Sequence, residues 1–130
     1  MKRSATGAVA LLAAGVSSGC TKPPAAAPRV NVEWTLSPSA PVAGPARLTV
    51  TLRDAQGDAI KGATVRLEGH MSHPGMAPVV ADARERTPGV YDLPFAFTMQ
   101  GDWVLLVSVT LPGGDRVERR IEVPRVGPSG

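Results

Sequence analysis

Hydrophobic and polar residues alternate along most of the chain from residue 30 onward. A two-residue period is typical of a β-strand with one buried face, because successive side chains of a strand point to opposite sides. No stretch of this region shows a convincing helical period. The alternating stretches predict about seven short strands, at 30–36, 47–52, 63–68, 79–83, 91–98, 103–111 and 117–123.

Proline, glycine and aspartate are concentrated between these stretches, as expected of turns. We expect 54–58 to form a hairpin turn and Pro94 to lie at a sheet edge or a bulge, because proline cannot donate to a strand ladder. Seven short strands separated by such turns predict an all-β fold, an Ig-like antiparallel β-sandwich. With a single cysteine, the domain is expected to fold without a disulfide.

The N-terminus has the pattern of a bacterial secretory signal. Lys2 and Arg3 precede an uncharged apolar run at 7–16, which is too short to span a bilayer. The run ends in Val-Ser-Ser-Gly before Cys20, which is similar to a lipobox with Ser17 in place of the usual leucine. We therefore expect cleavage after residue 19 and lipidation of Cys20. The alternative is ordinary cleavage after 25–27, which would release the protein from the membrane.

The predicted organisation is a signal peptide at 1–19, a Pro/Ala-rich tether at 20–29, a β-sandwich domain at 30–123 and a flexible tail at 124–130. A lipid on Cys20 would make the membrane the first partner and place the domain outside the cytoplasm. Thr21 follows the cysteine where an aspartate can favour the inner membrane, so we expect the outer membrane. No later segment is apolar enough to predict a transmembrane helix.

Net charge gives no reason to expect nucleic-acid binding. The chain has 14 basic and 11 acidic side chains, a formal charge of +3. Removal of 1–19 takes away Lys2 and Arg3 and no acid, which leaves 12 basic and 11 acidic side chains, or +1. The densest basic cluster, in 115–122, is interleaved with acids and indicates a solvated strand face.

The segment 69–78, with the sequence GHMSHPGMAP, concentrates the soft metal ligands of the chain. It holds both histidines, His70 and His73, and two of the three methionines that remain after the initiator, Met71 and Met76. Two glycines and two prolines predict a loop that follows the strand at 63–68. In such a loop the four side chains are free to converge.

The donor types in this segment select among metals. No Asp, Glu, Asn or Gln lies between His70 and Ala81, which disfavours Ca²⁺ and Mg²⁺. Two histidines alone do not make a structural zinc site. Thioether and imidazole suit copper(I), so we predict a copper(I) site at His70, Met71, His73 and Met76, with Met99 from a second turn as a fifth candidate. The alternative is that the methionines only fill the core.

Three short blocks resemble a known group of proteins. The blocks 69–76 (GHMSHPGM), 89–91 (GVY) and 97–103 (FTMQGDW) are similar to the YtkA-like/FixH-like domains of bacterial extracytoplasmic proteins. The resemblance covers roughly 30–123. It implies an Ig-like β-sandwich and a link to copper handling or cytochrome oxidase maturation.

Two functions follow from these patterns. The first is a membrane-tethered copper(I) chaperone or buffer that delivers the metal to a protein partner. The second is an interaction module of the cell envelope in which the His/Met segment is a structural cap. The chain shows no nucleophile triad, paired-carboxylate motif or phosphate loop, so we expect no enzymatic activity.

Overall fold

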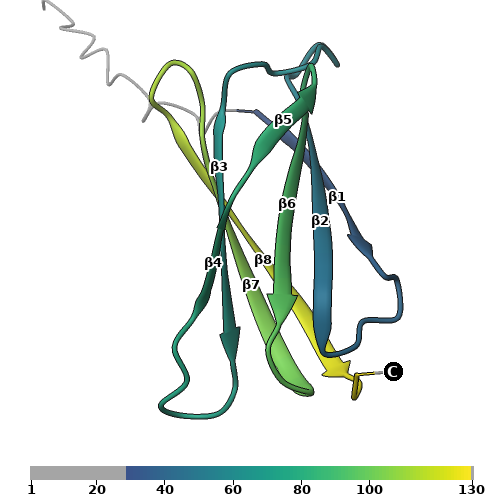
Figure 1. The fold of residues 1–130 in the computed structure, drawn as a ribbon. Helices are drawn as coiled ribbons and strands as arrows, with labels where there is room; N and C mark the ends of the chain where they lie inside the picture. The colour runs from purple at the N-terminus through teal and green to yellow at the C-terminus, as the bar shows by residue number, and fades with distance from the viewer. Residues whose placement is uncertain (1–28, 130) are drawn as a thin grey trace, which may run out of the picture.

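Two four-stranded antiparallel sheets pack face to face in this computed structural model, which describes residues 29–129 (Figure 1). The sheets have the strand orders β1-β2-β6-β5 and β4-β3-β7-β8. The described residues contain no helix, so the predicted all-β sandwich is confirmed. The strands are β1 (Asn31–Ser37), β2 (Gly44–Arg53), β3 (Thr64–Met71), β4 (Val79–Asp82), β5 (Arg84–Thr87), β6 (Val90–Phe97), β7 (Gly101–Thr110) and β8 (Arg116–Val126).

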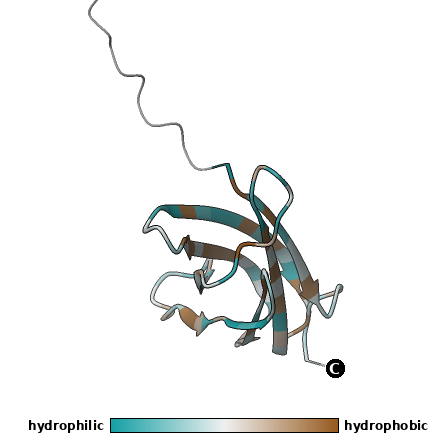
Figure 2. Cartoon of the chain, turned by 90° about the horizontal axis from the view of Figure 1, so that it is seen from above, coloured by the Kyte–Doolittle hydropathy of each residue, from teal (hydrophilic) through white to brown (hydrophobic). Residues whose placement is uncertain are grey.

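The core lies between the sheets and consists of the inward-facing residues that the alternation singles out. Figure 2 shows brown and teal positions alternating along the strands. Burial of these side chains is the main contribution to the stability of a domain of this size, since the described strands contain no cysteine. The largest fully buried side chains are Trp103, Tyr91, Phe97, Leu48, Leu52, Leu67, Leu93 and Leu105.

The strand β5 was not predicted. Its sequence, Arg-Glu-Arg-Thr, has no apolar residue and every position is exposed, so hydrophobic alternation cannot reveal it. It pairs with β6 only as far as Asp92. Pro94 therefore lies beyond the end of β5 and faces β2 on one side only, opposite Arg47, which agrees with the predicted local edge.

The turn at 54–58 forms as expected but does not join a hairpin. The Asp54 carboxylate accepts hydrogen bonds from the backbone N–H groups of Gln56 and Asp58, both at 2.9 Å. The strands that flank the turn, β2 and β3, belong to different sheets. The connection after Phe97 likewise crosses from β6 to β7 and so changes sheets.

The two long sides of the sandwich differ. On one side the chain passes from β4 to β5 through Ala83 alone, whose N–H donates to the Val65 carbonyl at 2.9 Å. This strand switches sheets and so closes that side (Figure 1). On the other side the edge strands are β1 and β8.

The predicted flexible tail was placed too early. β8 continues to Val126, which is 2 % exposed, and Gly127 forms a parallel bridge with Val42. Arg119 occupies a position of this strand where the alternation predicts an inward-facing apolar residue. It is exposed and lies opposite Val107. An inward-parity charge on an edge strand discourages pairing with another sheet.

The predicted signal, tether and Cys20 anchor lie in 1–28, outside the described residues. Within 29–129 no helix is long and apolar enough to cross a membrane. Within 29–129, every strand and every buried core side chain lies between residues 31 and 126. A chain that starts at residue 21 or 29 therefore keeps every strand that the structure describes.

Glu85, on β5, ties together the β2–β3 and β5–β6 connections at one end of the sandwich. Its carboxylate accepts hydrogen bonds from the backbone N–H groups of Gly62 and Gly89, both at 3.1 Å. These two bonds, Gly89 first, lower the pKa of Glu85. The neighbouring Tyr91 hydroxyl donates to the Ile60 carbonyl at 2.7 Å.

The lowered pKa predicts how stability depends on pH. The Glu85 contribution is fully present above the unfolded pKa of about 4.3 and is lost as the pH falls through the lower folded pKa. Urea midpoints measured at pH 6 and pH 3 should therefore differ less in Glu85→Gln than in the unmodified chain. Glu33→Gln, the same change at an exposed position of β1, should keep the full difference. Equal pH dependence in all three proteins would contradict the assignment.

Candidate metal site

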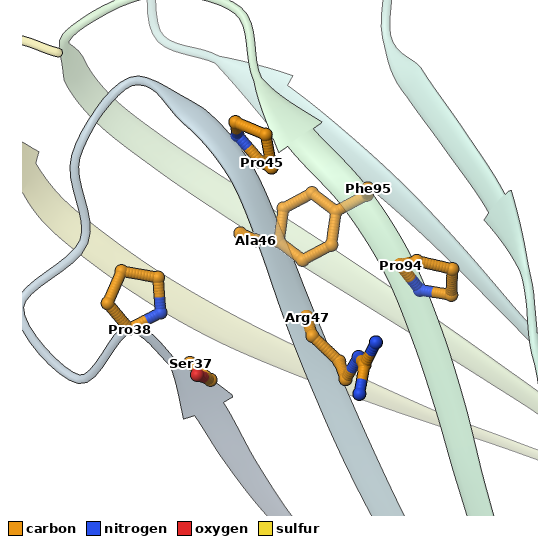
Figure 3. Close-up of a pocket in the computed structure, with 7 residues that line it drawn as sticks. All are labelled: Ser37, Pro38, Pro45, Ala46, Arg47, Pro94 and Phe95. Atoms are coloured by element: carbon orange, nitrogen blue, oxygen red, sulfur yellow. The ribbon is translucent and has the colours of Figure 1, made fainter.

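The hollow drawn in Figure 3 lies beside the start of β2 and has a volume of about 380 Å³. Prolines and Phe95 form much of its wall, and Arg47 is its only charged residue. None of the residues that line it is an imidazole, thioether or carboxylate donor. A metal site has to be sought at the His/Met segment instead.

The His/Met loop begins at Ser72 and not at Gly69 as expected. β3 runs through Met71, with His70 opposite Val104 and Met71 opposite Trp103 on β7. Gly69 is buried, and a Cβ atom there would lie 3.4 Å from Leu105 and 3.5 Å from the Trp103 ring. This glycine lies inside β3 against the Trp103 ring and does not end the strand.

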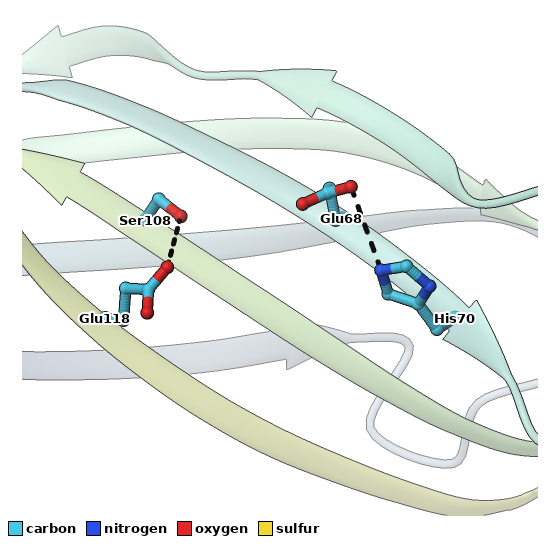
Figure 4. A network of polar contacts seen from close by, with 4 residues as sticks. All are labelled: Glu68, His70, Ser108 and Glu118. Carbon is cyan, nitrogen blue, oxygen red and sulfur yellow. Dashed lines mark hydrogen bonds and ion pairs between the residues drawn. The ribbon is translucent and has the colours of Figure 1, made fainter.

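Strand geometry separates His70 from Met71, because adjacent side chains of a strand point to opposite faces. Met71 is half-buried and packs against the core. Its terminal methyl lies 3.0 Å from the position that a Cβ of Gly101 would occupy. His70 points to the outer face, where its Nε2 lies 3.8 Å from the Glu68 carboxylate (Figure 4). The expected convergence of these two side chains is therefore not found.

A groove of about 580 Å³ brings His73 and Met99 together at one end of the sandwich. It lies where the β3–β4 loop, the β6–β7 connection and the end of β8 meet, at the lower end in Figure 1. The prediction that Met99 lies at the same end as the His/Met loop is thus confirmed. The groove is lined by Ser72, His73, Met99, Gln100, Gly101, Asp102, Arg125, Val126, Gly127 and Pro128.

Asp102 holds the three segments of this groove in place. Its backbone carbonyl accepts a hydrogen bond from the Ser72 N–H at 3.2 Å, at the start of the loop. Its side-chain Oδ1 accepts one from the Arg125 N–H at 2.8 Å. Arg125 has a φ of 54°, a left-handed conformation that is costly for a residue with a side chain. The groove is thus fastened by specific bonds from β7.

The carboxylate of Asp102 is also a potential metal ligand, and the sequence analysis did not identify it. The loop itself has no carboxylate, but the fold places this one beside His73 and Met99 in the groove. Among residues 29–129 there is no group of three or more His, Cys, Asp or Glu side chains that could hold a metal ion. Any metal at this groove would therefore depend on thioether donors.

The exposure of each methionine shows whether its side chain fills the core or is accessible to a metal ion. Met76 and Met99 are 42 % and 44 % exposed, so neither fills the core. Met76 follows Gly75, whose φ of 85° makes the tight turn at the tip of the loop. The core-filling alternative holds for Met71, which packs against the core, and not for the two exposed thioethers.

A family model for YtkA-like proteins matches residues 26–108, well over half of the chain. The chain belongs to the YtkA-like family. The match spans β1 to most of β7 and includes the His/Met loop and Met99. The resemblance seen in the three sequence blocks is confirmed.

Solved structures of similar shape are distant from this chain. The Lin-41 filamin domain has 19 % identity and a TM-score of 0.48, and the alignment covers 71 % of this chain and 92 % of that domain. The soluble domain of PmoD from Methylocystis sp. ATCC 49242 (Rockwell) has 14 % identity and a TM-score of 0.46, with 67 % and 75 % covered. Murine CRIg has 10 % identity and a TM-score of 0.43, with 78 % and 99 % covered. No curated protein sequence matches the chain.

Truncation of the methionines should separate their roles. Met71→Ala should lower the free energy of unfolding by about 1–2 kcal/mol, near the lower end for a buried methionine because Met71 is only half-buried. Met76→Ala and Met99→Ala should each change it by less than about 0.5 kcal/mol, as exposed positions do. Urea denaturation of the metal-free proteins measures all three. A large loss for Met99→Ala would identify Met99 as a structural cap.

Proposed function

We propose that the chain is an extracytoplasmic copper(I)-binding protein, held to the membrane by a lipid on Cys20, that acts as a metal chaperone or buffer. The observation that carries the proposal is the groove shared by His73 and Met99. These residues come from two connections at one end of the sandwich, and Met76 is exposed on the same loop as His73. Imidazole and thioether are ligands that suit copper(I).

The exposure of the donors fits transfer better than permanent storage. A buried and closed site would release its metal slowly, whereas the thioethers of Met76 and Met99 are open to solvent. A partner protein can then approach the metal directly and exchange ligands with it. Neutral imidazole and thioether donors also need no deprotonation near pH 7, unlike a cysteine thiol.

The geometry ranks the five predicted ligands. His73 and Met99 line the groove, Met76 is exposed on the same loop as His73, and the Met71 methyl lies near Gly101. His70, on the outer face of β3 beside Glu68, has the least support. We therefore propose His73, Met99 and Met76 as ligands and use His70 as the comparison.

The position of the groove is compatible with an N-terminal anchor. Arg29 and Val30 lie beside Asp54, at the turn between β2 and β3. The groove lies at the other end of the sandwich, beyond Phe97 (Figure 1). A membrane attachment on the N-terminal side would leave the groove accessible.

The second candidate is a metal-free interaction module of the cell envelope with the His/Met segment as a cap. The packing of Met71 against the core favours this candidate. It predicts that replacing His73 and Met99 changes stability and leaves metal affinity unaltered. The two candidates therefore give opposite results in one titration.

Copper(I) titration of the chain from residue 21, with a chromophoric chelator as competitor, tests the proposal. The double variant His73→Ala/Met99→Ala should bind at least about 10-fold more weakly, which corresponds to about 1.4 kcal/mol. His70→Ala should bind within about threefold of the unmodified chain. Silver(I) serves as a redox-inert repeat, and circular dichroism confirms that each variant is folded.

Two results would contradict the proposal. If the unmodified chain binds no more tightly than the double variant, the groove is not a copper site. If His70→Ala alone removes binding, the metal lies on the outer face of β3 and the proposed ligands are wrong.

A further inference from the structure

On the side of the sandwich between β1 and β8, the Val42–Gly127 bridge joins the sheets at one end, and the rest of that side carries an exposed tryptophan. Trp34 shares the inward parity of Val32 and Leu36 on β1, yet it is 45 % exposed. It lines a groove of about 540 Å³ between the edges of the two sheets. The groove is mostly apolar and is lined by Trp34, Thr35, Leu36, Ser39, Pro41, Glu122, Val123 and Pro124.

The strand β1 also differs from the other three sheet edges. β8 carries six charged residues and Pro124, and three of the four residues of β5 are charged. β4 has only four residues. These are the features by which edge strands avoid pairing with other chains. β1 has seven residues, no proline and one charge, Glu33, and within the described chain it pairs only with β2.

We propose that β1 is a self-association surface, on which the β1 strands of two copies pair antiparallel about a two-fold axis at Trp34. The two β1-β2-β6-β5 sheets then form one continuous sheet. A two-fold axis perpendicular to the sheet keeps the inner faces of both copies on the same side. Each exposed Trp34 side chain would then cover the open groove together with its counterpart.

The charge pattern of β1 favours this register. With Trp34 opposite Trp34 of the second copy, Glu33 lies opposite Thr35, and Val32 lies opposite Leu36. No two charges face each other, and directly opposed aromatic side chains are a stabilising cross-strand pair. A register centred on Glu33 would oppose two carboxylates, which is unfavourable.

Pairing of β1 with β8 of a second copy is the competing arrangement. It would be a head-to-tail contact that leaves a free β1 and a free β8, and so it would extend into an open chain of copies. Pro124 lacks the N–H for such a ladder, and Arg119 occupies an inward position on β8. The structure therefore favours the closed dimer through β1.

Sedimentation equilibrium of the chain from residue 21, over a wide concentration range, tests the proposal. The unmodified chain should reach the mass of a dimer at high concentration. Trp34→Lys should weaken association at least about 10-fold. Val80→Lys is the matched control, because Val80 is also 45 % exposed on an edge strand and the charge change is the same. Equal weakening by both variants would overturn the β1 assignment.

Disulfide cross-linking tests the register. A chain that starts at residue 21 lacks Cys20, so Glu33→Cys and Thr35→Cys each carry one cysteine. Oxidation of a mixture of the two variants should give mainly the mixed disulfide, because residues 33 and 35 are opposite each other and 33 does not face 33. Predominantly self-linked Glu33→Cys would overturn the register.

Other occupants of the groove give distinct results. If the chain from residue 21 remains monomeric and Trp34 is shielded from acrylamide, but becomes accessible in a chain from residue 29, residues 21–28 cover the groove. If the chain is monomeric with Trp34 accessible in both forms, the surface serves a different partner. Either result overturns self-association. The tryptophan fluorescence of the Trp34→Lys variant comes from Trp103 alone. Subtracting it from the fluorescence of the unmodified chain leaves the contribution of Trp34.

Discussion

The indole of Trp103 is buried between the two sheets, where its N–H group must find an acceptor to avoid the cost of an unpaired donor. It donates to the Met99 carbonyl at 3.0 Å. The ring also lies 5.4 Å from that of Phe97 in an edge-on contact, and it lies against Gly69 of β3. One core side chain thus fixes the β6–β7 connection that presents Met99, so the packing of the sandwich determines the shape of the groove.

A two-residue period in hydrophobicity reveals the strands that pack on the core and the face that each one buries. It does so because the period records contact with the core and nothing else. It cannot reveal β5, whose four residues contact no core. It also does not say which sheet a strand joins, so the turn at 54–58 was expected to close a hairpin. Gly69 was interpreted as a strand break, whereas it lies inside β3, paired with Leu105 on β7. Asp102 was missed because its place beside His73 depends on tertiary structure.

The two open features of the molecule are physically independent. The groove of His73 and Met99 lies at the end of the sandwich, whereas the groove of Trp34 runs along its side. Pairing through β1 therefore does not need to cover the proposed metal ligands. In a two-fold dimer with its axis along the membrane normal, both N-termini would lie at the same height. The proposed tethers could then have equal length in both copies, with the two His73–Met99 grooves at opposite ends of the dimer.

The position of Met71 limits how the groove could bind a metal. Its side chain packs against the core, and its methyl already touches the space at Gly101. To coordinate an ion it would have to leave that packing and lose the favourable burial of its thioether arm. His73, Met76 and Met99 are exposed and can rearrange at little cost. We therefore expect metal affinity to come from these three residues and not from Met71.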